Sequence, residues 1–346
     1  KASYRQPSVE DNRARLPALV WKDVMAVLEE CMLVDEAQGV RAIAISTLPF
    51  LPPKESGTEA CLESTWKAAA PGDNSESSVR AAALKALGLL SRVSPYSHDL
   101  TFLIRAADAM ERCHRDAFIA VRVRAAFALA TLCECSQLCK GARSEYMRHH
   151  ASLQLVRLVE FALRAVADND KVRVYGVRAL GYLAGRADFV QLLGSASSRE
   201  NAMALCARVE TELSRIIAPQ VHSVKARWNA CHSARLLFAA DAKPDELPWS
   251  IKLISALETA ATGADNFKVR IQATIALRSI RSATSFGGFE EVQRVWGVLI
   301  RAVQGQVELR DPSQYRYKDK LVAEQKLCLL RLTALLCDAL VAEQGG

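Results

Sequence analysis

Six arginines recur along the chain, and each follows a valine or alanine at the start of a short apolar stretch. Subtracting successive positions gives intervals of 39, 42, 51, 54 and 43 residues. A column of guanidinium groups, one per repeat, could follow a phosphate backbone or an acidic peptide. The alternative is structural, because five of the six have an aspartate a few residues earlier that could pair with them inside the array. The six are Arg41, Arg80, Arg122, Arg173, Arg227 and Arg270.

Further basic residues lie near these arginines, although the net charge of +7 is modest for the length of the chain. A solvated helix face explains them, an acidic partner surface is the second interpretation, and nucleic acid is the third. Base stacking requires exposed aromatic rings beside the cations. The five tryptophans instead recur at apolar helical positions and are predicted to be core residues. The basic residues are Lys85, Arg124, Lys171, Arg178, Lys225, Arg235, Lys268, Arg278 and Arg281, and the tryptophans are Trp21, Trp66, Trp228, Trp249 and Trp296.

A polar stretch near the C-terminal end interleaves aromatic and basic side chains. Loops can present the tyrosine and arginine anchors that interfaces favour, so this stretch is a candidate partner loop. An ordinary insertion is the other interpretation. The candidate residues are Arg310, Tyr315, Arg316, Tyr317, Lys318 and Lys320.

Ten cysteines include one cluster with some resemblance to a metal site. Cys133, Cys135 and Cys139 lie close in sequence to Cys113-His114 and His149-His150. Zinc needs ligands that converge tetrahedrally, whereas residues two apart on a helix point away from each other. We therefore predict no metal and no other cofactor.

The remaining cysteines favour reduced thiols over a disulfide framework, because they occupy apolar helix positions without regular spacing. We expect them to be buried: Cys61, Cys206, Cys231, Cys328 and Cys337. The sequence also contains no Gly-rich phosphate loop, no His-Glu-x-x-His motif and no nucleophile elbow. Catalysis and a small-molecule substrate are therefore not expected.

One template positions the recurring arginines. It reads V-R-x-x-A-x-x-A-L, and its clearest copy begins at Val269. The apolar positions at i, i+4, i+7 and i+8 lie on one face of a helix. Alanine or glycine at i+4 and i+7 allows a neighbouring helix to approach closely, toward the lower end of the usual separation of about 8–10 Å. Each copy is therefore predicted to be the inner, packed helix of a pair.

A period near 40 to 47 residues is typical of an α-solenoid, in which helix pairs stack without a second core, and the longer intervals imply insertions. The prediction is a right-handed α-solenoid of about seven helix pairs, continuous over residues 16–346 and preceded by a loose basic arm over 1–15. The composition agrees, since half of the residues are apolar and only 6% aromatic. Inner helices are expected near 38–51, 76–93, 118–133, 170–185, 224–240, 267–281 and 321–342.

The turn before each copy resembles the HEAT repeat, in which an acidic residue precedes Val-Arg. In HEAT arrays these side chains form a ladder of hydrogen bonds between adjacent turns, and the resemblance implies such a ladder here. The fifth copy departs, because His222-Ser223 stands where the acid belongs. The implied pairs are Asp35 with Arg41, Asp73 with Arg80, Asp116 with Arg122, Asp168 with Arg173, and Asp265 with Arg270.

The C-terminal half, roughly residues 165–340, further resembles one particular family of HEAT-repeat proteins in the order and spacing of four segments. That family has no established enzymatic activity, so the resemblance implies a scaffold and supplies no site. HEAT-like hydroxylases bind iron through His-Glu pairs, and no histidine here precedes a glutamate; helical-repeat DNA glycosylases remain a distant alternative. The four segments are Lys171–Gly181, Ala226–Cys231, Asn266–Ile271 and Val292–Leu299.

The sequence thus predicts a non-catalytic scaffold for protein partners, which could be acidic. The alternative is a nucleic-acid-associated module that uses the basic turns between helices. No run of 18 uncharged apolar residues exists, so no membrane span is expected. Because the chain begins with Lys1 rather than Met, we expect a segment of a longer protein. The expected reduced thiols favour a cytoplasmic or nuclear location.

Overall fold

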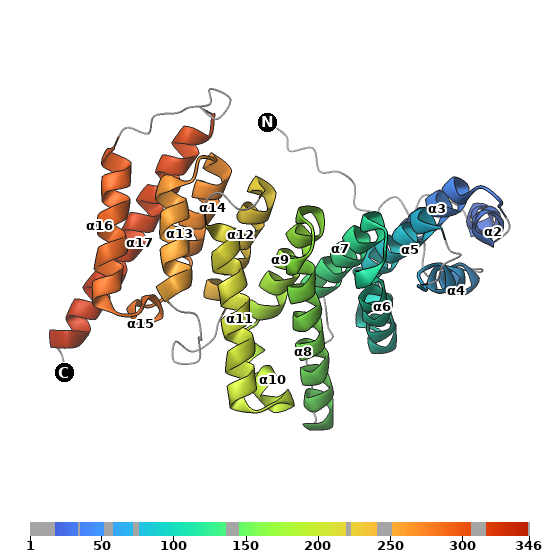
Figure 1. Cartoon of the computed structure of the whole chain (residues 1–346), viewed down its shortest axis with the longest axis horizontal. Coiled ribbons are helices and arrows are strands. Elements are labelled where there is room, and N and C mark those ends of the chain that lie inside the picture. Colours follow the sequence, from blue (N-terminus) through green and yellow to red (C-terminus); the bar gives the residue numbers. More distant parts are fainter. Residues whose placement is uncertain are drawn as a thin grey trace. The chain divides into compact units, whose positions relative to one another are not determined.

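The computed structural model describes eight stretches of the chain, and all regular secondary structure within them is helical (Figure 1). The predicted all-α fold is therefore confirmed. The chain divides into two compact units, residues 1–141 and 142–346, which are described separately. The predicted arm over 1–15 lies outside the described residues, which are 18–33, 35–51, 58–71, 76–135, 145–218, 223–240, 251–305 and 316–344.

The N-terminal unit consists of helix pairs. Helices α3, α5 and α7 pack against one another in that order, and α2, α4 and α6 pack against them. Each of α3, α5 and α7 carries one copy of the Val-Arg template. The bounds are α2 (Ala18–Leu33), α3 (Gln38–Thr47), α4 (Thr58–Ala68), α5 (Ser77–Leu90), α6 (Leu100–Arg112) and α7 (Ile119–Cys135).

The C-terminal unit has an inner row of helices, α9, α12, α14 and α17, in which each packs on the next. Helices α8, α11, α13 and α16 pack against this row, and the short α10 packs on both α8 and α11. The bounds are α8 (Glu145–Ala167), α9 (Asp170–Ala184), α10 (Phe189–Ala196), α11 (Arg199–Ile217), α12 (Val224–Ala239), α13 (Ile251–Gly263), α14 (Phe267–Arg278), α15 (Ala283–Phe286), α16 (Phe289–Gln304) and α17 (Lys318–Gln344).

Polar capping residues fix where the inner helices of this unit begin. Asn169 Oδ1 accepts a hydrogen bond from the Lys171 amide at 3.0 Å, and Asn266 Oδ1 accepts one from the Lys268 amide at 3.0 Å. Ser223 caps α12 by accepting from the Ala226 amide at 3.3 Å. Such caps satisfy amides that have no partner within the helix. They place the first turns of α9, α12 and α14 in equivalent positions of successive repeats.

Small residues allow neighbouring inner helices to cross closely. A Cβ atom on Gly181 of α9 would lie 2.7 Å from Ser233 Cβ of α12, which is too close for any real contact. The Ser233 hydroxyl donates a hydrogen bond to the Val177 carbonyl at 2.9 Å, so it joins the two helices at the same crossing. The helix spacing therefore depends on the small residues that follow each Val-Arg pair.

The thiols follow the sequence prediction with one exception. Cys61, Cys206, Cys231 and Cys328 are buried, whereas Cys337 is exposed on α17. The prediction for Cys337 was wrong because its apolar helix position lies on a side of α17 that other described residues leave open. Burial raises the pKa of Cys61 and Cys206 to about 11 and that of Cys231 to about 12.

These thiols should differ sharply in reactivity, because the thiolate is the reactive form. At pH 7.5 we expect iodoacetamide to alkylate Cys337 in the native protein at least about tenfold faster than Cys206 or Cys231. Peptide mass spectrometry after timed quenching measures each site, and alkylation in denaturant is the control. Equal rates in the native protein would contradict the burial described above.

No helix within the described stretches combines the length and hydrophobicity that crossing a lipid bilayer requires.

Candidate partner-binding surface

Three of the six recurring arginines contact backbone carbonyls at the ends of the preceding helices. In the C-terminal unit, Arg173 Nε donates to the Val166 carbonyl at 2.8 Å and Arg227 Nε to the Ile217 carbonyl at 3.2 Å. Arg270 Nε donates to the Ala264 carbonyl. The last carbonyls of a helix lack intrahelical donors and carry partial negative charge. Each of these arginines therefore caps the helix that precedes its own.

Two arginines of the N-terminal unit contact carbonyls of the turns that precede their own helices. Arg41 Nη1 donates to the Asp35 carbonyl, and Arg122 Nη1 donates to the Asp116 carbonyl at 2.9 Å. The expected pairs Asp35–Arg41 and Asp116–Arg122 are thus in contact, but through the main chain. The two carboxylates instead accept from nearby amides, Asp35 Oδ1 from Ala37 at 2.8 Å and Asp116 Oδ1 from Phe118 at 2.9 Å.

Side-chain ion pairs link successive repeats in the N-terminal unit. Arg80 Nε lies 2.9 Å from Asp116 Oδ2 of the next repeat, and Arg41 pairs with Glu76 of the next repeat. The pairing implied by the HEAT resemblance is therefore shifted by one repeat at these two positions. Asp73, the expected partner of Arg80, lies outside the described residues. An arginine side chain is long enough to reach an acid in its own turn or an acid in the next repeat, so sequence spacing alone does not decide between them.

Because they are turned inward, the arginines expose little charge. Arg80 and Arg227 are buried, and the other four are half-buried. Burial lowers the pKa of the Arg270 guanidinium, and the nearby Asp265 charge opposes this shift. Their geometry therefore favours a structural role over contact with a partner.

Replacing Arg270 by alanine should lower the free energy of unfolding by about 1.5 kcal/mol or more, because a charge-assisted hydrogen bond to a carbonyl is lost. Urea denaturation followed by circular dichroism measures the change. Arg235→Ala is the matched control, since Arg235 is exposed on the adjacent inner helix; it should change stability by less than about 0.5 kcal/mol. Equal effects of the two changes would argue against capping.

The predicted partner loop is only partly within the described residues. Arg310 and Tyr315 lie outside them, and Arg316 is exposed. Lys318 and Lys320 were predicted to be loop residues, but they lie in the first turn of α17. Tyr317 packs on a core cluster formed by Phe267, Ile271 and Leu321. This contact fixes the start of α17 beside α14.

Three helices of the inner row, α9, α12 and α14, carry many more cationic than anionic side chains. Helices α9, α12 and α14 together contain nine cationic side chains and one carboxylate, that of Asp170. By contrast, α11 contains three of each sign and α16 contains two of each. The nine are Lys171, Arg173, Arg178, Lys225, Arg227, Arg235, Lys268, Arg270 and Arg278.

Aromatic rings lie beside several of these cations and connect neighbouring helices. Lys225 Nζ of α12 is 5.9 Å from the ring centre of Tyr175 on α9, and Lys268 Nζ of α14 is 5.4 Å from that of Tyr317. Arg316 also lies over Tyr317, at 4.9 Å. These distances are within the range of cation–π attraction. We call this surface the basic–aromatic strip, defined as Lys171, Tyr175, Lys225, Trp228, His232, Lys268, Arg316 and Tyr317.

Trp228 contributes an exposed ring to the strip. The sequence predicted a core tryptophan, but Trp228 is 36% exposed and stacks on His232 with ring centres 5.7 Å apart. His232 Nδ1 lies 3.3 Å from Gln272 Nε2 of α14. The positions equivalent to Trp228 in neighbouring repeats, Val174 and Ile271, are buried. The larger Trp228 side chain is therefore partly exposed at a position where the smaller Val174 and Ile271 are buried in neighbouring repeats.

The other tryptophans differ in burial. Trp21 and Trp66 are buried as predicted, and Trp249 lies outside the described residues. Trp296 is half-buried, and its indole Nε1 donates a hydrogen bond to Thr333 Oγ1 at 3.0 Å.

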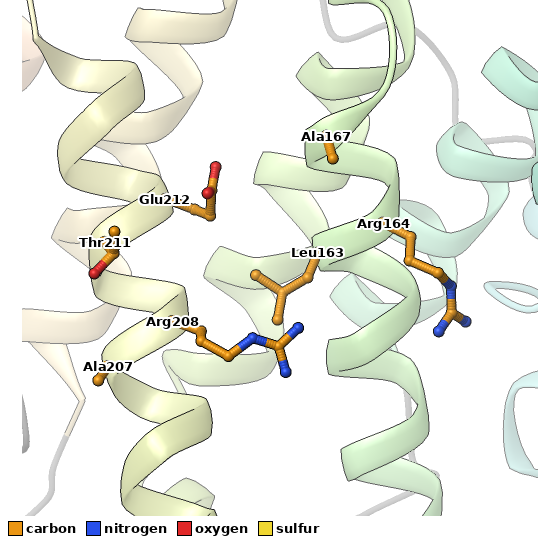
Figure 2. A pocket seen from close by; sticks show the side chains of 7 residues that line it. All are labelled: Leu163, Arg164, Ala167, Ala207, Arg208, Thr211 and Glu212. Carbon is orange, nitrogen blue, oxygen red and sulfur yellow. The ribbon is translucent and has the colours of Figure 1, made fainter.

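A shallow hollow of ≈ 440 Å³ lies between α8 and α11 (Figure 2). Leu163 points from α8 toward α11, whereas Arg164 points away from α11 (Figure 2). Arg208 Nη2 donates to Glu160 Oε2 at 3.0 Å, and Glu212 pairs with Arg215 at 2.6 Å. Since internal ion pairs already engage two of its charged residues, the hollow lacks the convergent polar groups of a typical small-molecule site.

Only part of the cysteine cluster lies within the described residues. Cys133 is buried, and Cys113 Sγ donates to the Ala69 carbonyl at 3.3 Å. The structure does not describe the side chains of Cys135, Cys139, His149 or His150. No group of three or more His, Cys, Asp or Glu side chains is suited to hold a metal ion in the described part of the chain.

No model of a known protein family matches the chain. An uncharacterized protein from Dictyostelium discoideum is 32% identical over 110 residues, which make up 32% of this chain and 7% of that protein. The chain therefore spans far less than two thirds of that relative.

Two solved structures show the fold. A designed armadillo repeat protein in complex with the peptide (KR)4 has a TM-score of 0.51 at 14% identity, covering 78% of this chain and 99% of its own. An engineered protein has a TM-score of 0.51 at 17% identity, covering 79% of this chain and 98% of its own. The chain has an all-α solenoid fold. Its helix pairs are thus arranged as in proteins built from stacked repeats.

Proposed function

We propose that this chain is a non-catalytic scaffold that binds acidic segments of protein partners. The observation that carries the proposal is the charge asymmetry of the C-terminal unit, in which α9, α12 and α14 are cationic while α11, α16 and α17 are balanced. Three of these cations cap helix ends, and the exposed ones include Lys171, Lys225 and Lys268. Complementary charge steers association and selects partners. The exposed Trp228 and Arg316, beside the half-buried Tyr175 and Tyr317, are residue types that interfaces favour, and the neighbouring lysines add positive charge.

The similarity to the designed armadillo repeat protein supports the general mode of binding. That protein is in complex with a basic peptide, whereas the inner row here is cationic. By electrostatic complementarity, the corresponding partner of this chain is acidic. The resemblance of the C-terminal half to HEAT repeat-containing protein 6 agrees with a scaffold. We further propose that the chain acts in the cytoplasm or nucleus and binds no cofactor.

Single-stranded nucleic acid is the alternative, because exposed aromatic rings beside cations can also serve as stacking platforms. Trp228 is the specific residue that favours it. The two partners differ in salt response. Binding to phosphates weakens by roughly one power of salt concentration for each contact, whereas a protein interface anchored by aromatic side chains weakens far less.

A pull-down from extracts of cells that express the protein tests the proposal. The bait is the full chain, with and without nuclease, at 100 and 400 mM salt. We expect protein partners to remain after nuclease treatment and at the higher salt concentration. Recovery of nucleic acid alone, lost at 400 mM salt, would replace the scaffold by the alternative.

A further inference from the structure

Three lysines occupy the same place in three successive repeats. Lys171, Lys225 and Lys268 each directly precede the Val-Arg or Ala-Arg pair and are the second residue of α9, α12 and α14, respectively. All three are exposed. No ion pair joins any of them to a carboxylate in the stretches that the structure describes. We call these residues the lysine column.

The location of the lysine column is unfavourable for each helix taken alone. The N-terminal turn of a helix carries partial positive charge, so acidic side chains stabilise it and cations destabilise it. A residue that breaks such a local rule without structural compensation often has a functional role. Here the rule is broken on three adjacent helices of one row.

Neighbouring rings orient two members of the column. Lys225 of α12 lies over Tyr175 of α9, and Lys268 of α14 lies over Tyr317, which directly precedes α17. Each contact therefore joins neighbouring parts of the inner row. The rings limit the motion of the ammonium groups while leaving them exposed. Adjacent packed helices lie about 8–10 Å apart, so successive lysines are expected at about that interval.

We propose that the lysine column binds an extended acidic segment in the polyproline II conformation, with a carboxylate at every third residue. Polyproline II has three residues per turn and a rise of about 3.1 Å per residue, so every third side chain points in one direction at intervals of about 9.3 Å. This interval matches the spacing of stacked helices. The inference rests on the proposed scaffold function and adds the conformation and charge spacing of the partner.

The other geometries fit less well. In a β-strand, side chains three residues apart point to opposite faces, so a period of three would present alternate carboxylates to solvent. Bases of a nucleic acid need open ring faces, but the Tyr175 and Tyr317 rings each lie against a cation. Trp228, between the lysines of α9 and α14, instead offers apolar surface to the residues that separate the carboxylates.

Two fluorescein-labelled peptides of identical composition test the spacing. One is four repeats of Glu-Pro-Pro; the other has four consecutive glutamates flanked on each side by four prolines. Fluorescence anisotropy with the full chain at 100 mM salt gives both dissociation constants. We expect the periodic peptide to bind about three- to tenfold more tightly, because more of its carboxylates face the column together. Equal affinities would overturn the inference in favour of diffuse charge attraction.

A matched pair of double variants tests the residues. Lys225→Glu with Lys268→Glu should weaken binding of the periodic peptide at least about tenfold. Arg199→Glu with Lys252→Glu makes the same charge change in the first turns of two adjacent outer helices, α11 and α13, and should leave its affinity within about twofold. Equal losses in both variants would contradict a local site.

Thermal unfolding separates binding from folding. Glutamate is favourable in the first turn of a helix, and this gain offsets the loss of the cation–π contacts with Tyr175 and Tyr317. The Lys225→Glu, Lys268→Glu variant should therefore unfold within a few degrees of the unchanged protein. A midpoint lowered by more than this, together with lost binding, would mean that the lysines support the fold, which would overturn the inference.

The same variants distinguish this inference from the scaffold proposal. If the Lys225→Glu, Lys268→Glu protein still retains all protein partners in the pull-down, the scaffold remains and the lysine column is wrong. If neither the unchanged protein nor the Lys225→Glu, Lys268→Glu variant retains a protein partner, the scaffold proposal itself fails. Tighter binding of a 12-nucleotide single strand than of the periodic peptide, lost in the same variant, would also overturn the inference.

Discussion

Replacing Arg80 by alanine is expected to lower the free energy of unfolding by about 3–5 kcal/mol, because it leaves the Asp116 carboxylate buried without its ion partner. The two side chains are only 4% and 7% exposed. Arg80 Nε lies 2.9 Å from Asp116 Oδ2, and Nη2 lies 3.4 Å from Oδ1. The remaining bond from the Phe118 amide to Asp116 Oδ1 compensates only part of the lost interaction.

Urea denaturation of the full chain measures this effect. Arg105→Ala is the control, because Arg105 forms an ion pair with Glu63 in the same unit but both side chains are about half exposed. The control should cost no more than about 1 kcal/mol. Replacing both Arg80 and Asp116 by apolar residues of similar volume should restore most of the stability. Equal costs for Arg80→Ala and Arg105→Ala would show that the pair contributes no more than a surface contact.

The second large effect is expected at the crossing of α9 and α12. Gly181→Ala should lower the free energy of unfolding by about 3 kcal/mol, although alanine favours helix more than glycine does. The new Cβ would lie 2.7 Å from Ser233 Cβ and 2.8 Å from Ser233 Cα. Since one of these atoms belongs to the backbone, relief requires the helices to separate.

Gly194→Ala is the matched control, because Gly194 lies within α10 and a Cβ atom added there would have no neighbouring atom within 4 Å among the described residues. Here the substitution should stabilise the protein by about 0.5–1 kcal/mol. The additional change Ser233→Gly should recover part of the loss at Gly181. Thermal and urea unfolding should therefore give opposite signs for the two glycines, and a common sign would contradict close packing at Gly181.

Periodicity explains why the helices could be predicted. The Val-Arg template places apolar and small residues on one face, and that face packs in α5, α9 and α14 because a neighbouring helix covers it. The structure adds the capping residues: Asn169 and Asn266 provide side-chain oxygens that cap the first turns of α9 and α14.

The contacts between repeats could not be predicted in the same way. An arginine can reach an acid in its own turn, a carbonyl at the end of the preceding helix, or an acid in the next repeat, and sequence spacing does not rank these acceptors. Arg80 and Arg227 illustrate two of the three outcomes. Similarly, the period places Trp228 on a helix face but does not state whether a neighbour is large enough to cover its ring.

The first-turn lysines also affect how the protein would respond to selection. At Lys171, Lys225 and Lys268, a change to an acidic residue improves the local electrostatics of the helix. Variants selected only for heat resistance should therefore accumulate acidic substitutions at these positions and lose the cationic character of the inner row. Retention of lysine at these three positions would then indicate that partner binding constrains the protein more strongly than thermal stability does, and acidic substitutions would indicate the reverse.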